Sequence, residues 1–364
     1  MITVVIPTYK RPQLLKRAVK SVLNQTYPHF TILIADNASG DETDSVVQQL
    51  VQKDQRIKLL KQKTNLGMSA NFQSAFMQVT TPYVCFLPDD DFYAPTFFEE
   101  TLSAFSHYPD ICFAGGGSEL FIDQNHTISC LSAYFKQKCP PTGYYPPAKS
   151  LLAHFRAYSG IQFPSSLFKT DCLHTIGGFD VRLKFCIDSD LISKCAARFP
   201  VYLITDRIFY FYYQNSTSLS RSFDLQQQEI EAHYLHENIL LTPLPPTDRQ
   251  VIDLWYQSWK MRICCGLYGY YYSRREFQKA YLYAEKLYHM TGAARWKKRK
   301  THTKLYAHFS FLSFIYQALK VCERGLRFYK KKSKVSSSMP SQEVIYTTHS
   351  DTDFWKQYAL SLET

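Results

Sequence analysis

Residues 2–11, which read ITVVIPTYKR, decide the fold of the N-terminal part of this chain. Their short apolar run, Thr3-Val4-Val5-Ile6, ends at Pro7, and such a run is typical of a buried strand. Apolar residues at helical spacing follow within residues 11–26. The stretch therefore predicts a buried strand, a short polar turn and a helix.

The same alternation continues through the first hundred residues. Further strands are predicted at 30–35 (FTILIA), 57–60 (IKLL) and 83–87 (YVCFL), and further helices at 41–53 and 69–79. This βαβαβαβ order implies a parallel sheet with right-handed crossovers. Ligands of such sheets bind at the carboxyl ends of the strands, and Asp36 and Asp89–Asp91 each lie just past such an end.

The composition is that of a globular protein, with 364 residues, 45% apolar and 20% charged. No window holds the roughly 20 uncharged apolar residues of a spanning helix, and we expect no secretory signal at the N-terminus. The ten cysteines form no CxxC pair and no zinc-type cluster. This argues against a zinc site or a disulfide framework and suits a reducing compartment.

From about residue 222 the sequence pattern changes from mixed α/β to helical. Residues 110–220 continue as mixed α/β, and the turn-rich stretch 139–147 is predicted to be a loop. Helices are predicted at 222–242, 247–272 and 275–290. The division that follows is an α/β domain over 1–220, a helical region over 221–294, a basic amphipathic segment over 295–334 and a flexible tail over 335–364.

Three carboxylates, Asp89, Asp90 and Asp91, follow the fourth strand directly. Hard cations such as Mg²⁺ or Mn²⁺ take oxygen ligands of this kind together with phosphate oxygens. A solvated acidic turn or a helix cap is the alternative. Asp36 likewise either belongs to an ordinary turn or accepts a hydrogen bond from a ligand N–H such as that of uracil.

A second acidic segment lies at residues 177–192. A Gly-Gly-Phe-Asp turn at 177–180 precedes Asp188 and Asp190, which open an amphipathic helix. Acids at a helix start are favoured by the helix dipole, which is the structural explanation. The functional alternative is a general base.

Together these segments resemble the family 2 glycosyltransferases of the GT-A fold. The resemblance covers about residues 1–220 and rests on the order and spacing of 6–11 (IPTYKR), 21–27 (SVLNQTY), 36–37 (DN), 65–67 (NLG), 89–91 (DDD), 177–180 (GGFD) and the Asp188 segment. It implies an α/β, Rossmann-like nucleotide-diphospho-sugar transferase domain with a C-terminal helical extension.

The resemblance also implies a donor site. Thr8 and Tyr9 would line the nucleotide pocket, and Asp36 would bind the imide N–H of uracil or thymine. The nucleotide-binding residues implied are Pro7, Thr8, Tyr9, Arg11, Asp36, Asn65, Gly67 and Asp89. The acidic run matches the family's DxD element and implies a divalent metal, Mg²⁺ or Mn²⁺, on Asp90 and Asp91.

The candidate general base is Asp188, and Asp190 is a second acid that could meet the acceptor. A single displacement with this base would invert the anomeric carbon. The sequence departs from the family pattern in three places: Pro88 replaces an acid, Ile187 replaces the acidic neighbour of the base, and Asn215 stands where a His is common.

The implied reaction transfers a sugar from a nucleoside-diphosphate sugar, with UDP-sugar favoured, to a saccharide or lipid-linked acceptor of cell-surface polysaccharide or lipopolysaccharide. The departures leave a catalytically degenerate nucleotide-sugar-binding protein as an alternative. A nucleotidyltransferase of related fold is another, although such enzymes usually carry a Gly-rich loop where this chain has residues 7–11.

Residues 295–334 hold 13 of the 42 Lys and Arg residues and one acid, Glu323, against a net charge of +11 for the chain. The high charge therefore belongs to this segment. Aromatic residues accompany it, which suits a helix on an anionic membrane surface. A helix packed on the protein is the alternative. No RNA-binding motif accompanies the segment, so we expect no nucleic-acid partner. The membrane interpretation leads us to expect a cytoplasmic, peripheral location at the inner face of the plasma membrane.

Overall fold

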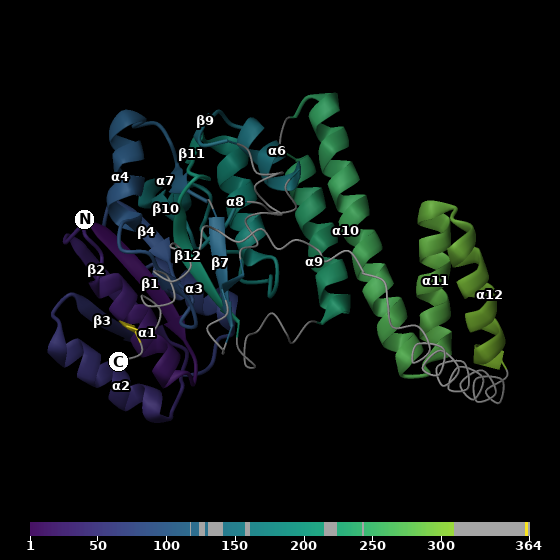
Figure 1. Cartoon of the computed structure of the whole chain (residues 1–364), viewed down its shortest axis with the longest axis horizontal. Coiled ribbons are helices and arrows are strands. Elements are labelled where there is room, and N and C mark those ends of the chain that lie inside the picture. Colours follow the sequence, from purple (N-terminus) through teal and green to yellow (C-terminus); the bar gives the residue numbers. More distant parts are fainter. Residues whose placement is uncertain are drawn as a thin grey trace, which may run out of the picture. The chain divides into compact units, whose positions relative to one another are not determined.

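The computed structural model describes residues 1–116, 118–123, 128–129, 141–156, 161–214, 224–241, 244–308 and 361–362. They divide into two compact units. The first holds the described residues of Met1–Phe223, His233–Trp255 and Val344–Thr364, and the second holds those of Asp224–Ala232 and Tyr256–Glu343. Figure 1 names the helices and strands of both.

The first unit begins with a parallel half-sheet in the order β3-β2-β1-β4. Its elements are β1 (Ile2–Thr8), α1 (Pro12–Leu23), β2 (Phe30–Asp36), α2 (Glu42–Lys53), β3 (Ile57–Lys61), α3 (Met68–Phe76) and β4 (Tyr83–Phe86). The predicted alternation is confirmed throughout. Thr8 pairs with Asp36 in the β1–β2 register, so the polar ends of these strands lie at one edge of the sheet.

Local chemistry explains where the helices start. Pro12 occupies the first turn of α1, where its missing N–H costs nothing. The Asp41 carboxylate caps α2 by accepting the Thr43 N–H at 2.9 Å. Asn71 of α3 donates from Nδ2 to the Ala35 carbonyl at 2.9 Å, which fixes this helix against the end of β2.

The sheet is extended by four further strands, in the order β10-β6-β11-β9 after β4. The elements here are α4 (Phe97–His107), β6 (Phe113–Gly115), β9 (Gly143–Tyr145), α6 (Lys149–Arg156), β10 (Ser166–Lys169), α7 (Thr170–Thr175), α8 (Ile187–Arg198) and β11 (Val201–Leu203). The prediction of a loop over 139–147 is wrong at residues 143–145, which form β9. These residues pair with β11 as an edge strand, a position that tolerates nearby prolines.

A second sheet has the order β5-β12-β7-β8. Its strands are β5 (Phe92–Tyr93), β7 (Ser118–Asp123), β8 (Ile128–Ser129) and β12 (Ile208–Gln214). Phe92 and Phe211 stack in parallel with ring centroids 4.7 Å apart. The start of β5 follows Asp91 directly, so the acidic run is anchored between the two sheets.

The C-terminal helices are α9 (Leu225–Leu240), α10 (Pro246–Ser273), α11 (Phe277–Thr291) and α12 (Ala294–His308). The helices predicted at 222–242, 247–272 and 275–290 are confirmed with small shifts of their ends. Gly292 ends α11 in the left-handed conformation that glycine adopts without strain. Within the described part of the chain, none of the helices is long and apolar enough to cross a membrane.

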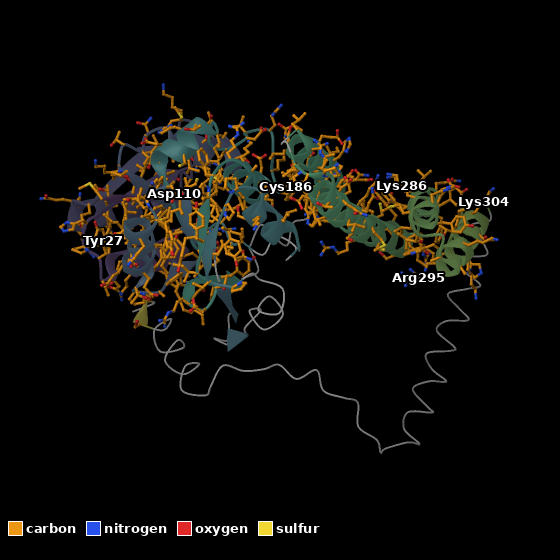
Figure 2. All side chains as sticks on the ribbon, turned by 90° about the horizontal axis from the view of Figure 1, so that it is seen from above. Tyr27, Asp110, Cys186, Lys286, Arg295 and Lys304 are labelled. Atoms are coloured by element: carbon orange, nitrogen blue, oxygen red, sulfur yellow. The ribbon has the colours of Figure 1, made fainter. Side chains whose placement is uncertain are left out.

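In the second unit, helices α11 and α12 pack side by side (Figures 1 and 2). Trp296 and Thr303 are the buried side chains of α12, while Arg295, Lys297 and Lys298 are exposed. The Arg299 guanidinium lies 4.6 Å from the Trp296 ring centroid. Residues 295–304 of the basic segment therefore form a helix with one packed and one solvated face, whereas 309–334 lie outside the described residues.

Candidate active site

Asp36, at the carboxyl end of β2, is a buried carboxylate of which only one oxygen is engaged. Its Oδ1 accepts hydrogen bonds from the backbone N–H and the hydroxyl of Ser39. Among the described residues Oδ2 has no hydrogen-bond partner, although the side chain is only 1% exposed. Leaving a buried carboxylate oxygen unpaired is costly, so this atom is poised to accept a donor from a ligand.

The neighbouring loops are held by asparagine side chains. Asn37 donates from Nδ2 to Asn65 Oδ1 at 3.0 Å and accepts the Leu66 N–H at 2.8 Å. Asn65 Oδ1 also accepts the Gly67 N–H at 2.9 Å, and Gly67 adopts a φ of 81° as it starts α3. Asn37, for which no individual role was predicted, ties the β2 loop to the Asn65–Gly67 turn.

Tyr9 lies beside this turn with its ring 40% exposed. A hydrogen bond with Asn65 lowers the pKa of the Tyr9 hydroxyl, and the Lys10 ammonium lies 5.3 Å from the ring centroid. The adjacent Pro7 is half-buried at the end of β1. An exposed aromatic face next to a buried unpaired acceptor can stack on a planar ring.

The three carboxylates of the acidic run after β4 point in two directions, and Asp89 and Asp90 point toward Arg11. Asp89 Oδ2 accepts the Thr8 hydroxyl at 2.7 Å, and Asp89 Oδ1 lies 3.1 Å from Arg11 Nη1. The same Nη1 lies 3.0 Å from Asp90 Oδ2. Burial first, and then the neighbouring Asp90 charge, raise the pKa of Asp89 to about 6.

Asp91 points the other way, into the second sheet. It accepts the Tyr210 hydroxyl and, at 2.9 Å, the Tyr213 N–H, and burial raises its pKa well above the ordinary range. The buried Arg17 donates to the Asp90 carbonyl oxygen at 2.5 Å and stacks 3.8 Å from the Tyr213 ring centroid. The structure thus separates Asp91 from Asp89 and Asp90, and it adds Arg17, which sequence reasoning missed.

The oxygens of Asp89 and Asp90 suit a hard divalent cation, since they already face one cationic group together. Among the described residues, three or more His, Cys, Asp or Glu side chains nowhere converge as a metal cage. The protein would then supply one or two ligands, and diphosphate and water oxygens would supply the rest, as is usual for Mg²⁺. The donor set fits the expected ion on this basis.

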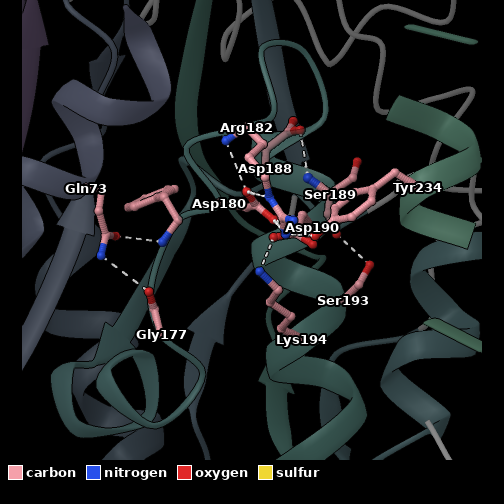
Figure 3. A network of polar contacts seen from close by, with 11 residues as sticks. Gln73, Gly177, Asp180, Arg182, Asp188, Ser189, Asp190, Ser193, Lys194 and Tyr234 are labelled. Carbon is pink, nitrogen blue, oxygen red and sulfur yellow. Dashed lines mark hydrogen bonds and ion pairs between the residues drawn. The ribbon is translucent and has the colours of Figure 1, made fainter. Parts of the chain in front are cut away.

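Asp188 lies in the first turn of α8, in a second polar cluster (Figure 3). Its Oδ1 accepts the Ser189 N–H at 2.7 Å. Desolvation by the surrounding protein atoms raises its pKa, and hydrogen bonds from Ser189 oppose the rise, while the residue itself is exposed. A carboxylate that is near water can accept a proton.

The turn before α8 is held by Asp180, Arg182 and Tyr234 (Figure 3). Asp180 forms an ion pair with Arg182 at 2.7 Å and accepts the Tyr234 hydroxyl at 2.7 Å. The bond to Arg182, followed by that to Tyr234, keeps the pKa of Asp180 well below its usual range. Asp190 is buried and paired with Lys194 at 2.5 Å, so its carboxylate points into the protein.

Helix α3 connects the two clusters. It begins next to Gly67, and the Ser69 hydroxyl donates to the Leu183 carbonyl. Gln73 accepts the Phe179 N–H at 2.8 Å and donates to the Gly177 carbonyl at 3.3 Å (Figure 3). One helix therefore carries the Asn65–Gly67 turn at its start and the 177–183 turn along its side. Asn215 lies outside the described residues.

A mostly parallel sheet with polar side chains gathered at the ends of β1, β2 and β4 is the arrangement of a nucleotide-sugar transferase of the GT-A fold. Residues 3–147 match the family model described as Glycosyl transferase family 2. Over these residues the resemblance drawn from the motifs is confirmed.

Curated relatives match parts of the chain. A Campylobacter jejuni protein, GalNAc(5)-diNAcBac-PP-undecaprenol beta-1,3-glucosyltransferase, is 40% identical over 91 residues, which are 25% of this chain and 29% of that protein. The chain thus spans less than a third of the length of this relative.

Solved structures match over a larger part. S. aureus TarS 1–349 in complex with UDP-GlcNAc has a TM-score of 0.60 at 15% identity, covering 82% of this chain and 83% of that one. The mannosyltransferase PcManGT from Pyrobaculum calidifontis, in complex with GDP-Man and Mn²⁺, has a TM-score of 0.52 at 14% identity, covering 83% and 84%. These likenesses confirm the predicted fold.

Proposed function

We propose that the chain is an inverting, hexosyltransferase-like enzyme that transfers a sugar from a nucleoside-diphosphate sugar, with UDP-sugar favoured. The buried, unpartnered Oδ2 of Asp36 carries this proposal. It lies at the strand end where ligands of parallel sheets bind, and a uracil ring offers one imide N–H to such an acceptor. Thr8, Tyr9, Asn65 and Gly67 surround the same edge and would complete the nucleotide site.

The leaving diphosphate gains negative charge as the glycosidic bond breaks, so positive charge near Asp89 and Asp90 would favour its departure. A divalent ion, Mg²⁺ or Mn²⁺, when bound, would supply this stabilisation as a Lewis acid. Asp90 is the proposed ligand. Asp91 is proposed to hold the acidic run in place, because its carboxylate accepts hydrogen bonds from β12.

Asp188 is the proposed general base. Its carboxylate would remove the proton of the acceptor hydroxyl as that oxygen attacks the anomeric carbon, which inverts the carbon in one displacement. The raised pKa makes it a stronger base than an ordinary aspartate. The buried ion pair with Lys194 gives Asp190 the role of holding the start of α8.

The relatives support the choice of substrates. One solved neighbour binds UDP-GlcNAc, another binds GDP-Man with Mn²⁺, and the C. jejuni relative is named for an undecaprenol-linked acceptor. A saccharide or lipid-linked acceptor of a cell-surface polysaccharide or lipopolysaccharide follows as the proposed acceptor. A cytoplasmic location at the inner face of the plasma membrane suits it.

Calorimetric titration of UDP into the full chain tests the donor site, with dTDP and GDP as comparisons. The uracil N–H would donate its hydrogen bond to the charged carboxylate of Asp36. Asp36→Asn should therefore weaken UDP binding by a factor of roughly ten or more. Asp110→Asn is the matched control, since Asp110 lies before β6 and bonds Tyr144. Equal UDP binding by both variants and the wild type would contradict the assignment.

A catalytically degenerate nucleotide-sugar-binding protein is the second candidate. Pro88 and Ile187 stand where the family pattern has acids, and this observation favours it. The two candidates share the donor site and differ in whether Asp188 performs a step. Binding of UDP-sugar without any UDP release from any donor would favour the binding protein.

We also propose that α12 binds an anionic membrane surface. Residues Ala294–His308 contain no acid, and the exposed positions Arg295, Lys297, Lys298, Arg299 and Lys304 give α12 a positive outer face. Lys and Arg near an anionic bilayer each contribute about 1 kcal/mol. Trp296 and Thr303 of the same helix are buried, so α12 has both packed side chains and an exposed basic face.

A further inference from the structure

The Arg11 guanidinium lies between the two carboxylates that face the donor site. Its Nη1 is 3.1 Å from Asp89 Oδ1 and 3.0 Å from Asp90 Oδ2. The three side chains are 17%, 7% and 11% exposed. Although partial burial lowers the pKa of Arg11, the charges of Asp89 and Asp90 outweigh this effect and raise it.

This contact balances the charge of the acidic run. Three carboxylates, Asp89, Asp90 and Asp91, meet two guanidinium groups, those of Arg11 and Arg17. Arg17 donates to the Asp90 carbonyl oxygen and stacks on the Tyr213 ring, so it stabilises the backbone and β12 next to the acidic run. Arg11 bridges the very oxygens that a divalent cation would use.

We propose that Arg11 competes with the divalent cation for Asp89 and Asp90, and that a nucleoside diphosphate relieves this competition. This inference rests on the proposed function for the identity of the ion and of the nucleotide. A metal ion and Arg11 cannot both neutralise the same pair of carboxylates without repelling each other. The ion must therefore displace the guanidinium from the Asp90 carboxylate.

The diphosphate gives the displaced guanidinium an anionic partner, because guanidinium groups bind phosphate oxygens well. Metal binding then favours nucleotide binding, and by linkage nucleotide binding favours metal binding by the same factor. Arg11 acts as a positioning residue in this scheme. It keeps the acidic pair together before the donor arrives and makes metal binding dependent on the nucleotide.

Mn²⁺ binding to the full chain, followed by electron paramagnetic resonance of the free ion, tests the competition directly. Without nucleotide, Arg11→Gln should bind Mn²⁺ roughly tenfold more tightly than the wild type, a typical size for coupling between sites. Addition of UDP should tighten Mn²⁺ binding in the wild type and tighten it much less in Arg11→Gln. Lys16→Gln, an exposed substitution on α1, is the matched control and should behave as the wild type.

Two further variants keep the test decisive. Asp90→Asn in the Arg11→Gln background should abolish the gained Mn²⁺ binding, which locates it at this pair. Because loss of Arg11 removes a positive charge that faces two buried carboxylates, Mn²⁺ should also raise the thermal midpoint of Arg11→Gln more than that of the wild type. Arg11→Lys, which keeps the charge, should restore part of the competition.

Unchanged or weaker nucleotide-free Mn²⁺ binding by folded Arg11→Gln would overturn the inference. This arm contains no nucleotide, so its outcome is separate from that of the donor proposal. Tighter Mn²⁺ binding by Arg11→Gln with no response of any variant to UDP, dTDP or GDP would support the competition and contradict the nucleotide site.

Discussion

At the scale of single residues, the site depends on carboxylates whose environments differ sharply. Asp36 is buried with one oxygen unpaired, Asp89 is bridged to Arg11, Asp91 is bonded to β12, and Asp188 reaches solvent. The same residue type can therefore serve as a ligand acceptor, a cation partner, a structural anchor or a base. Orientation and burial decide between these roles.

The raised pKa of Asp89 predicts a pH dependence of stability. Its ordinary pKa is 3.8 and its pKa in the folded protein is about 6, so the native state holds a proton that the unfolded chain releases. The contribution of this group to the free energy of unfolding is therefore present below about pH 4 and is lost as the pH rises to about 6, by up to about 3 kcal/mol. Asp89→Asn should lack this loss.

Urea denaturation at pH 4.5 and pH 7 measures it as the difference between wild type and variant. Because both proteins share every other carboxylate, their difference isolates Asp89. Asp110→Asn serves as the control and should show no such change. A wild-type stability that rises relative to Asp89→Asn over this interval would contradict the raised pKa.

At the scale of elements, α3 and the turns that contact it connect the proposed donor site with the proposed base Asp188. Gly178 has a φ of 68°, and a Cβ there would lie 2.4 Å from Gln73 Oε1 and 2.9 Å from Phe76 Cδ1. Gly177 has a φ of 84° and open space around it. A substitution at Gly177 therefore tests backbone strain alone, whereas one at Gly178 tests backbone strain together with packing.

Gly178→Ala should be more destabilising than Gly177→Ala. Both substitutions cost about 1–2 kcal/mol for the left-handed backbone. Gly178→Ala adds about 1–3 kcal/mol of overpacking against α3. Urea denaturation measures both, and equal losses would show that α3 yields to the extra methyl group.

The sequence predicted the elements better than the contacts. The strands and helices of residues 2–87 follow from hydrophobic periodicity, and the carboxyl-end rule located Asp36 and the acidic run. Which way Asp91 points depends on β12, more than a hundred residues later. Arg17 and Tyr234 act through tertiary contacts that no local pattern encodes. The short strand at 143–145 is defined by its pairing with β11 and not by its own composition.

At the scale of the whole molecule, the charge of the chain is divided by unit. Residues 295–334 account for the net positive charge, and the described part of this segment forms the outer face of α12 (Figure 2 labels Arg295 and Lys304). The α/β unit carries the family 2 domain and is close to neutral. The proposed surface binding and the proposed sugar transfer thus belong to different units.

Charge reversal on α12 tests the membrane proposal in the full chain. Lys297→Glu with Lys298→Glu should weaken sedimentation with phosphatidylserine-containing vesicles by well over tenfold, given about 1 kcal/mol per lysine. Lys58→Glu with Lys63→Glu, exposed positions of the α/β unit, is the matched control. Equal binding to neutral phosphatidylcholine vesicles would contradict the proposal, and binding of an oligonucleotide in its place would replace it.

The proposed function requires that this chain turn over a nucleoside-diphosphate sugar with Asp188 as the base. Release of UDP from a panel of UDP-sugars, with a saccharide or lipid-linked acceptor and Mn²⁺, measures it directly. Asp188→Asn should lose roughly 10²–10⁴-fold in kcat and bind UDP as the wild type does, while Asp171→Asn, exposed on α7, should keep full activity. UDP release by Asp188→Asn at the wild-type rate would contradict the claim.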